Sequence, residues 1–142
     1  MEKFPFSKAE WAAVSDAALP VVNATMVDDA VLRASHLVGL LDVLAELRAR
    51  HGDHPVLLET EADFADDDRE RIVLYRRAVG IADSHGLPTL SIRLSLSRLL
   101  LDQGEQAAAR QELLACEGEV SGGDVSDRTS WAELMAEARP AE

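Results

Sequence analysis

Residues 51–54 hold the closest group of side chains that could bind a metal ion. His51, Asp53 and His54 supply two imidazoles and a carboxylate, which are ligand types that zinc accepts. They straddle Gly52, so the two rings need not converge, and no fourth ligand is evident. His51 also has a structural use, because positive charge is favourable at the C-terminal end of a helix. We therefore expect no metal ion and no other cofactor.

No arrangement typical of catalysis is recognisable in the chain. Cys116 is the only cysteine, which excludes an internal disulfide or a multi-thiolate metal site. We expect its thiol to be buried as a small apolar group. A nucleophile elbow, a phosphate-binding glycine loop and a Ser/His/Asp arrangement are absent. The sequence therefore predicts a protein that is not an enzyme.

Acidic side chains are concentrated between residues 59 and 70. The segment lacks the spaced ligands and central glycine of a calcium loop. Two of the acids suffice to cap the helix that follows, and the others predict an exposed negative patch. The seven are Glu59, Glu61, Asp63, Asp66, Asp67, Asp68 and Glu70.

The chain as a whole is also strongly acidic. The 142 residues include 14 basic and 26 acidic ones, a net charge of −12. Such a surface repels nucleic-acid phosphates and anionic lipids and attracts a basic protein, although acidity can also serve solubility alone. The N-terminus does not resemble a signal peptide, and no apolar run approaches the ~18 residues of a membrane-spanning helix. We expect a cytoplasmic protein that contacts neither nucleic acid nor membrane.

The pattern of the whole chain predicts an all-α protein of about seven helices. Aromatic residues make up only 4%, so the core must consist of Leu, Val, Ile and Ala, which favours helices, and strand patterns are nearly absent. We expect one domain over 1–142 made of stacked antiparallel hairpins. It comprises an N-terminal hairpin over 7–51, two hairpins over 54–117 and a capping helix over 124–138.

Local signals place the helix boundaries of the N-terminal half. Ser7 and Glu10 form a capping box, and Pro20 should kink or end the first helix. Residues 31–47 are apolar over most of the helical circumference, which is typical of a helix sandwiched between others. His51 followed by Gly52 is a stop signal.

The C-terminal half has boundary signals of its own. His85 followed by Gly86 ends one helix, Pro88 begins the next and Gly104 separates it from its partner. The glycines at 118, 122 and 123 suggest a flexible linker. Ser126 is the expected cap of the last helix.

The hairpin over 90–117 resembles a tetratricopeptide repeat, whose pattern is W-x2-L-G-x2-Y, then A-x3-F, then a proline. Small residues stand where the two helices should touch, while the Trp and Pro positions differ. A poorer copy begins at Pro55, with Glu59 and Arg71 at the small positions, so about half the chain is covered. The matching positions of the better copy are Arg93, Leu96, Ser97, Leu100, Ala109, Leu113 and Ser121.

This resemblance implies a concave surface that holds partner segments, lined by the first helix of each hairpin. Its mixture of carboxylates, one Arg and a few aliphatic side chains suits a polar or basic partner. The corresponding residues are Asp53, Val56, Thr60 and Asp63 from one hairpin, and Ser91, Leu94, Arg98, Leu101 and Asp102 from the next.

These features favour a protein that binds another protein stoichiometrically. A small, acidic, helical chain resembles bacterial immunity proteins and antitoxins, which neutralise a toxin domain that is often basic. The patch expected to contact such a toxin comprises Asp63, Asp66, Asp67 and Asp68.

Two other functions stay open at this point. One is an adaptor or secretion chaperone that holds a peptide in the concave groove, where Leu94, Arg98 and Leu101 would matter most. The other is a self-associating structural protein that docks through Trp131 and Met135 of the last helix. Both a monomer and a homodimer are compatible with the sequence.

Overall fold

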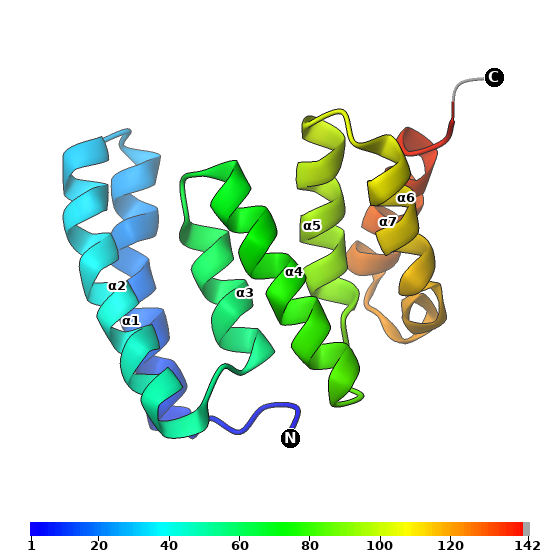
Figure 1. Cartoon of the computed structure of the whole chain (residues 1–142). Coiled ribbons are helices and arrows are strands. Elements are labelled where there is room, and N and C mark those ends of the chain that lie inside the picture. The colour runs from blue at the N-terminus through cyan, green and yellow to red at the C-terminus, as the bar shows by residue number, and fades with distance from the viewer. Residues whose placement is uncertain (141–142) are drawn as a thin grey trace.

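The computed structural model describes residues 1–140, in which the regular secondary structure is all helical and no strand is present. The predicted all-α fold with about seven helices is confirmed, because there are seven α-helices and one 3-10 helix in this part of the chain. Their bounds are α1 Lys8–Met26, α2 Ala30–His51, α3 Pro55–Phe64, α4 Asp68–Ser84, α5 Leu90–Asp102, α6 Gln106–Ala115, η1 Glu117–Gly122 and α7 Val125–Glu137. Figure 1 shows the pairs α1–α2, α3–α4 and α5–α6 following one another in chain order across the molecule, with α7 beside the last pair.

Neighbouring helices pack as antiparallel pairs. The most extensive contacts join α1 to α2, α3 to α4 and α5 to α6, as the side-by-side pairs in Figure 1 show. The pairs are joined to one another through α2 and α3 and through α4 and α5, and α7 covers α5 and α6. Every helix therefore has a neighbour against which it can bury its apolar stripe.

The buried side chains form two hydrophobic clusters that meet at α3. Leu57 belongs to the N-terminal cluster with Leu40 and Leu44 of α2. Leu58 and Ala62 belong to the larger cluster formed by α3 to α7. Adjacent residues of one helix thus face two cores, and α3 is the element that joins the N-terminal hairpin to the rest of the chain.

The first helix begins as predicted and runs further than expected. The Ser7 hydroxyl accepts from Glu10 N at 3.0 Å, and a Glu10 carboxylate oxygen accepts from Ser7 N at 2.9 Å, which confirms the capping box. Pro20 lies inside α1, which continues to Met26, so the interpretation of Pro20 as a helix end is wrong. Val21 after the proline is fully buried, and this packing offsets the backbone hydrogen bond that proline removes.

The second helix is not sandwiched, contrary to the expectation. Only Leu40, Leu44 and Leu47 are buried, while Val31 is 83% exposed and Val38 58% exposed. The physical reason is position, because α2 belongs to the terminal pair and its principal contacts are with α1 and α3 alone. One face of α2 therefore carries apolar residues that no other part of residues 1–140 covers.

The turns follow the glycine signals. Gly52 has φ 75° and Gly104 has φ 77°, values that glycine adopts at little cost and other residues rarely do. The helices before them end where predicted, α2 at His51 and α5 just before the turn at Gly104.

The glycines near residue 120 are part of a folded segment, so the flexible-linker interpretation is wrong. Residues Glu117–Gly122 form η1, and Glu119 reaches back to the start of α5. Its carboxylate accepts from Thr89 N at 2.7 Å, from Leu90 N at 3.2 Å and from Thr89 Oγ1 at 2.6 Å.

This contact supplies the acceptors that an N-cap side chain normally provides. α5 accordingly begins at Leu90, not at Pro88. The last helix is capped by Asp124, whose side chain accepts from Asp127 N at 2.7 Å, and not by Ser126 as predicted. Asp124 precedes the helix and so has the extended backbone that a cap requires.

The contact between α5 and α6 has the expected small residues. Ser97 Oγ donates to the Ala109 carbonyl oxygen at 3.4 Å, and both residues are fully buried. Cys116 is also buried, as predicted, and burial raises the pKa of its thiol to about 11.

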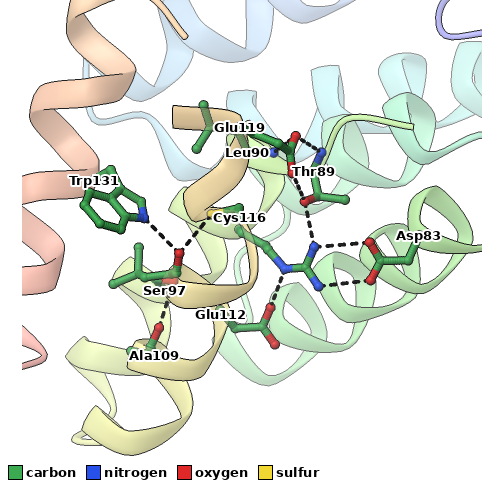
Figure 2. A network of polar contacts seen from close by, with 11 residues as sticks. Asp83, Thr89, Leu90, Ser97, Ala109, Glu112, Cys116, Glu119 and Trp131 are labelled. Carbon is green, nitrogen blue, oxygen red and sulfur yellow. Dashed lines mark hydrogen bonds and ion pairs between the residues drawn. The ribbon is translucent and has the colours of Figure 1, made fainter. Parts of the chain in front are cut away.

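A buried guanidinium joins three helices beside this contact (Figure 2). Arg93 of α5 is 8% exposed and donates to both Asp83 oxygens at 3.2 and 3.0 Å, and to Glu112 at 3.0 Å. Its Nη1 also donates to Thr89 Oγ1 at 2.6 Å. Burial alone would lower the pKa of Arg93, but the hydrogen bonds and charges of Asp83 and Glu112 outweigh it and raise the pKa.

Replacing Arg93 tests how much this network contributes to the stability of the fold. We expect Arg93→Met to lower the free energy of unfolding by about 3 kcal/mol, because the variant leaves two carboxylates without their cation. Urea denaturation measures the loss. The matched control is Arg76→Met on the exposed side of α4, which should change stability by less than about 0.5 kcal/mol. Equal losses in the two variants would contradict the role of the network.

The Glu10 carboxylate makes stability depend on pH. The hydrogen bond from Ser7 N, followed by the interaction with His51, lowers the pKa of Glu10 from 4.5 to about 2. A carboxylate with a depressed folded-state pKa stabilises the fold above its unfolded pKa, and this contribution is lost as pH falls through the folded value. Its window therefore runs from about pH 4.5 down to about pH 2.

We expect Glu10→Gln to lower the urea midpoint at neutral pH, with a difference from the wild type that shrinks on acidification through this window. Urea titrations at a series of pH values provide the measurement. Glu46→Gln is the control, because Glu46 pairs only with Arg50 on the surface and should have little effect. A difference that stays constant with pH would contradict the assignment to Glu10.

Candidate functional site

The most distinctive surface feature is a groove between α2 and the corner where α3 turns into α4. We call it the acidic groove. Its volume is about 600 Å3, and five carboxylates but only one guanidinium line it. The lining residues are Leu37, Leu41, Asp42, Ala45, Arg48, Glu61, Ala65, Asp66, Asp67 and Glu70.

Helical periodicity explains the floor of the acidic groove. Leu37, Leu41 and Ala45 follow one another at intervals of four and so lie on one face of α2. They are partly or largely exposed because α3 crosses beside them without covering them. Asp42 stands next to Leu41 at the edge of this apolar strip.

Three of the groove's carboxylates already have partners in the fold. Glu61 pairs with Arg48 at 3.0 Å, and Asp66 pairs with Arg33 at 2.8 Å. Asp67 is the N-cap of α4 and accepts a hydrogen bond from its first turn at 3.1 Å. These contacts hold the α3–α4 corner in place at one wall of the groove.

The other two carboxylates are exposed and uncommitted. Asp42 and Glu70 make no ion pair or side-chain hydrogen bond with any residue among 1–140. An exposed carboxylate beside an apolar strip can pair with an incoming cation without first breaking a contact in the fold. These two side chains are therefore the ones best placed to meet a basic partner.

The structure divides the predicted acidic patch. Asp66 and Asp67 line the acidic groove, as described above. Asp63 instead accepts from the hydroxyl of the buried Tyr75, and Asp68 pairs with Arg71 at 3.5 Å and accepts from Gln103. Asp63 and Asp68 are absent from the groove lining, so only two of the four expected residues line the groove.

The predicted concave strip is also only partly assembled. Leu94, Arg98 and Asp102 do lie together, in a cleft of about 380 Å3 between α5 and α7. The Glu137 carboxylate accepts two hydrogen bonds from Arg98, at 2.7 and 3.1 Å. This bond raises the pKa of Arg98, so its charge already has a counterion within the chain.

Three other residues of the predicted strip lie outside this cleft. Leu101 packs against the larger core, and Thr60 donates from its hydroxyl to the Val56 carbonyl oxygen at 2.8 Å. Asp53 pairs with Arg48 at 3.4 Å and with Arg77 of α4. The repeat resemblance assigns them to one concave surface, but the contacts that each side chain makes direct them to different neighbours.

The three residues considered for a metal site make separate contacts. His51 Nε2 lies 2.9 Å from a Glu10 oxygen, while His54 caps α3 and contacts the Glu2 carbonyl oxygen at 2.8 Å. Asp53 bonds to arginines, as noted above. Among residues 1–140, no three His, Cys, Asp or Glu side chains come together as a metal site would require.

The expected docking face on the last helix is not free. Trp131 Nε1 donates to the Leu113 carbonyl oxygen at 2.8 Å, as Figure 2 also shows. Trp131 and Met135 both pack against the larger core. Self-association through these two side chains stays a prediction, and part of their apolar surface is already used within the chain.

The sequence pattern did not predict that α2 forms the floor of the acidic groove. The apolar circumference of residues 31–47 predicts a helix that is covered on most sides, whereas Leu37 is only partly buried and Leu41 is exposed. A usable signal was present in Asp42, because a carboxylate within such a run indicates that part of the circumference meets water.

The fold and groove together define an all-α protein of stacked helical hairpins with an acidic, apolar-floored surface groove. No protein-family model, curated protein or solved structure matches the chain. None of the helices within residues 1–140 combines the length and apolar character needed to cross a membrane.

Proposed function

We propose that this protein is a non-enzymatic binding module that holds a basic segment of another protein in the acidic groove. The observation that carries the proposal is the apolar strip of α2 bordered by five carboxylates and a single guanidinium. Charge steering would speed the encounter, and burial of the strip would hold the complex together.

The shape of the groove favours one form of partner segment. Leu37, Leu41 and Ala45 form a straight apolar line along α2. An amphipathic helix with one apolar stripe and flanking Lys or Arg side chains is complementary to such a line. Its cations would meet Asp42 and Glu70 on opposite walls of the groove.

Stoichiometric inhibition is the biological form of binding that we favour. The net charge of −12 and the acidic groove both suit a basic target. The chain is similar in this character to small bacterial immunity proteins and antitoxins, which act by occupying a toxin domain. This part of the proposal rests on analogy of charge and fold class.

A second candidate function is a peptide-binding adaptor or secretion chaperone that uses the cleft between α5 and α7. The cleft combines Leu94, Leu99 and Leu134 with polar side chains, a mixture that suits an extended peptide. When a peptide enters the cleft, the ion pair between Arg98 and Glu137 would either break or stay intact at the edge of the cleft. Leu94→Ala distinguishes the two candidates, because it should weaken binding only if the cleft is the site.

Charge reversal in the acidic groove tests the main proposal. We expect Asp42→Lys combined with Glu70→Lys to weaken binding of a Leu/Lys amphipathic helical peptide at least tenfold, or about 1.4 kcal/mol. Fluorescence anisotropy at low and moderate salt measures the affinity. The wild-type affinity should fall with added salt, since exposed charges are screened.

The control is Glu105→Lys combined with Glu117→Lys, which changes the net charge equally at exposed positions outside the groove. It should retain most of the affinity. An equal loss in both double variants would mean that only overall charge matters, and the assignment to the groove would fail. Pull-downs from a native lysate with the same two double variants distinguish two kinds of bound protein. A protein that binds in the groove should be lost only from the Asp42→Lys/Glu70→Lys variant, whereas a protein held by overall charge should be lost from both.

A further inference from the structure

A smaller pocket lies beneath the N-terminal segment, on the side of α3 that faces α5. We call it the N-terminal pocket. Its volume is about 230 Å3. The lining comes from the segment before α1, the start of α3, the turn before α5 and the first turn of α5. The residues are Lys3, Phe4, His54, Pro55, Val56, Glu59, Leu87, Pro88, Ser91 and Ile92.

The wall formed by the N-terminal segment is held in place. The Glu2 carbonyl oxygen lies 2.8 Å from Nε2 of the buried His54. The Phe4 ring packs edge-on against Phe6 and Trp11, each at 5.1 Å between ring centroids. One wall of the pocket is thus held in place, and the lining comes from distant parts of the sequence.

Most of the pocket is apolar, and Glu59 is its one acidic side chain. The carboxylate is half-buried and makes no ion pair with any residue among 1–140. Burial raises the pKa of Glu59, and the facing Ser91 hydroxyl offsets this only in part, while the charge of Asp63 raises it further. A carboxylate in such surroundings is partly desolvated and has no counterion among residues 1–140, which is an unfavourable state that a bound cation would relieve.

The one cation on the pocket lining is Lys3, which is exposed and forms no salt bridge with Glu59. The other charged neighbour, Asp63, has the same sign as Glu59. The pocket therefore has apolar walls and a negative group that forms no ion pair with the cation on its lining.

We propose that the N-terminal pocket binds a primary alkylammonium group. Its ammonium would bond to Glu59 and Ser91, and its alkyl chain would lie against Val56, Ile92 and Phe4. A hydrated inorganic cation would leave these apolar walls unused, and a neutral chain would leave the carboxylate unpaired. Two sources share the required chemistry, a free alkylamine and a lysine side chain of a protein.

This inference is independent of the proposed function. The N-terminal pocket and the acidic groove share no lining residue. Charge reversal at Asp42 and Glu70 leaves Glu59 and Ser91 unchanged, so either proposal can fail while the other stands.

The test titrates n-butylammonium into the full chain at neutral pH and follows the backbone amide signals by NMR. Binding should shift the amides of Val56, Ser91 and Ile92 and saturate, whereas n-butanol should not bind measurably. Glu59→Gln should weaken the amine at least tenfold with the remainder of the spectrum unchanged. Equal binding by the wild type and Glu59→Gln, or equal binding of alcohol and amine, would overturn the proposal.

A matched control and a second ligand complete the experiment. Glu133→Gln removes a carboxylate from the α5–α7 cleft and should leave amine affinity unchanged. A blocked lysine peptide and its norleucine analogue then distinguish the sources. Tighter binding of the lysine peptide than of the amine would support a protein side chain, and binding of the amine alone would support a free ligand. The absence of saturable shifts with either would overturn the site.

Discussion

The guanidinium of Arg93 is enclosed by protein, and a buried cation is tolerated only when anions and acceptors surround it. Asp83 at the end of α4, Thr89 at the start of α5 and Glu112 on α6 supply them. This requirement sets the positions of three helices relative to one another. Thr89 also bonds to Glu119, so the same network positions η1 and, through it, the segment that leads into α7. Much of the C-terminal half is thereby arranged around one charge.

The N-terminal hairpin joins the rest of the chain through hydrophobic packing on α3 and through two arginines of α2, Arg33 and Arg48, which pair with Asp66 and Glu61. Leu57 and Leu58 face different cores, so α3 is shared between the two parts. Because α1 and α2 form the end of the stack, none of the helices within residues 1–140 covers the outer face of α2. The acidic groove lies where the apolar side of α2 meets the charged corner between α3 and α4. The N-terminal pocket lies at the other side of α3, closed by the segment that precedes α1.

The acidic residues divide into those that stabilise the fold and those that remain for other contacts. Glu61, Asp66 and Asp67 pair with arginines or cap a helix, so their charges are partly neutralised. Asp42, Glu70 and Glu59 have no such partner among residues 1–140. Total charge alone does not reveal this division, because it depends on which arginine reaches which carboxylate. The two proposed sites are defined by the carboxylates that the fold leaves without cations.

The sequence by itself determined the helices, because capping residues, turn glycines and helix propensity act over a few residues. Ser7 with Glu10, and Gly52 and Gly104, were sufficient to place boundaries without any tertiary information. Only the tertiary structure decided how α5 is capped, because Glu119 is distant from α5 in the chain. The exposure of one face of α2 was also decided there, because it depends on whether another helix packs against that face. Of the predicted site residues, Asp66 and Asp67 line the acidic groove, whereas Asp53, Asp63 and Leu101 bond or pack elsewhere. Which helical faces meet is a property of the packed chain, and local spacing cannot specify it.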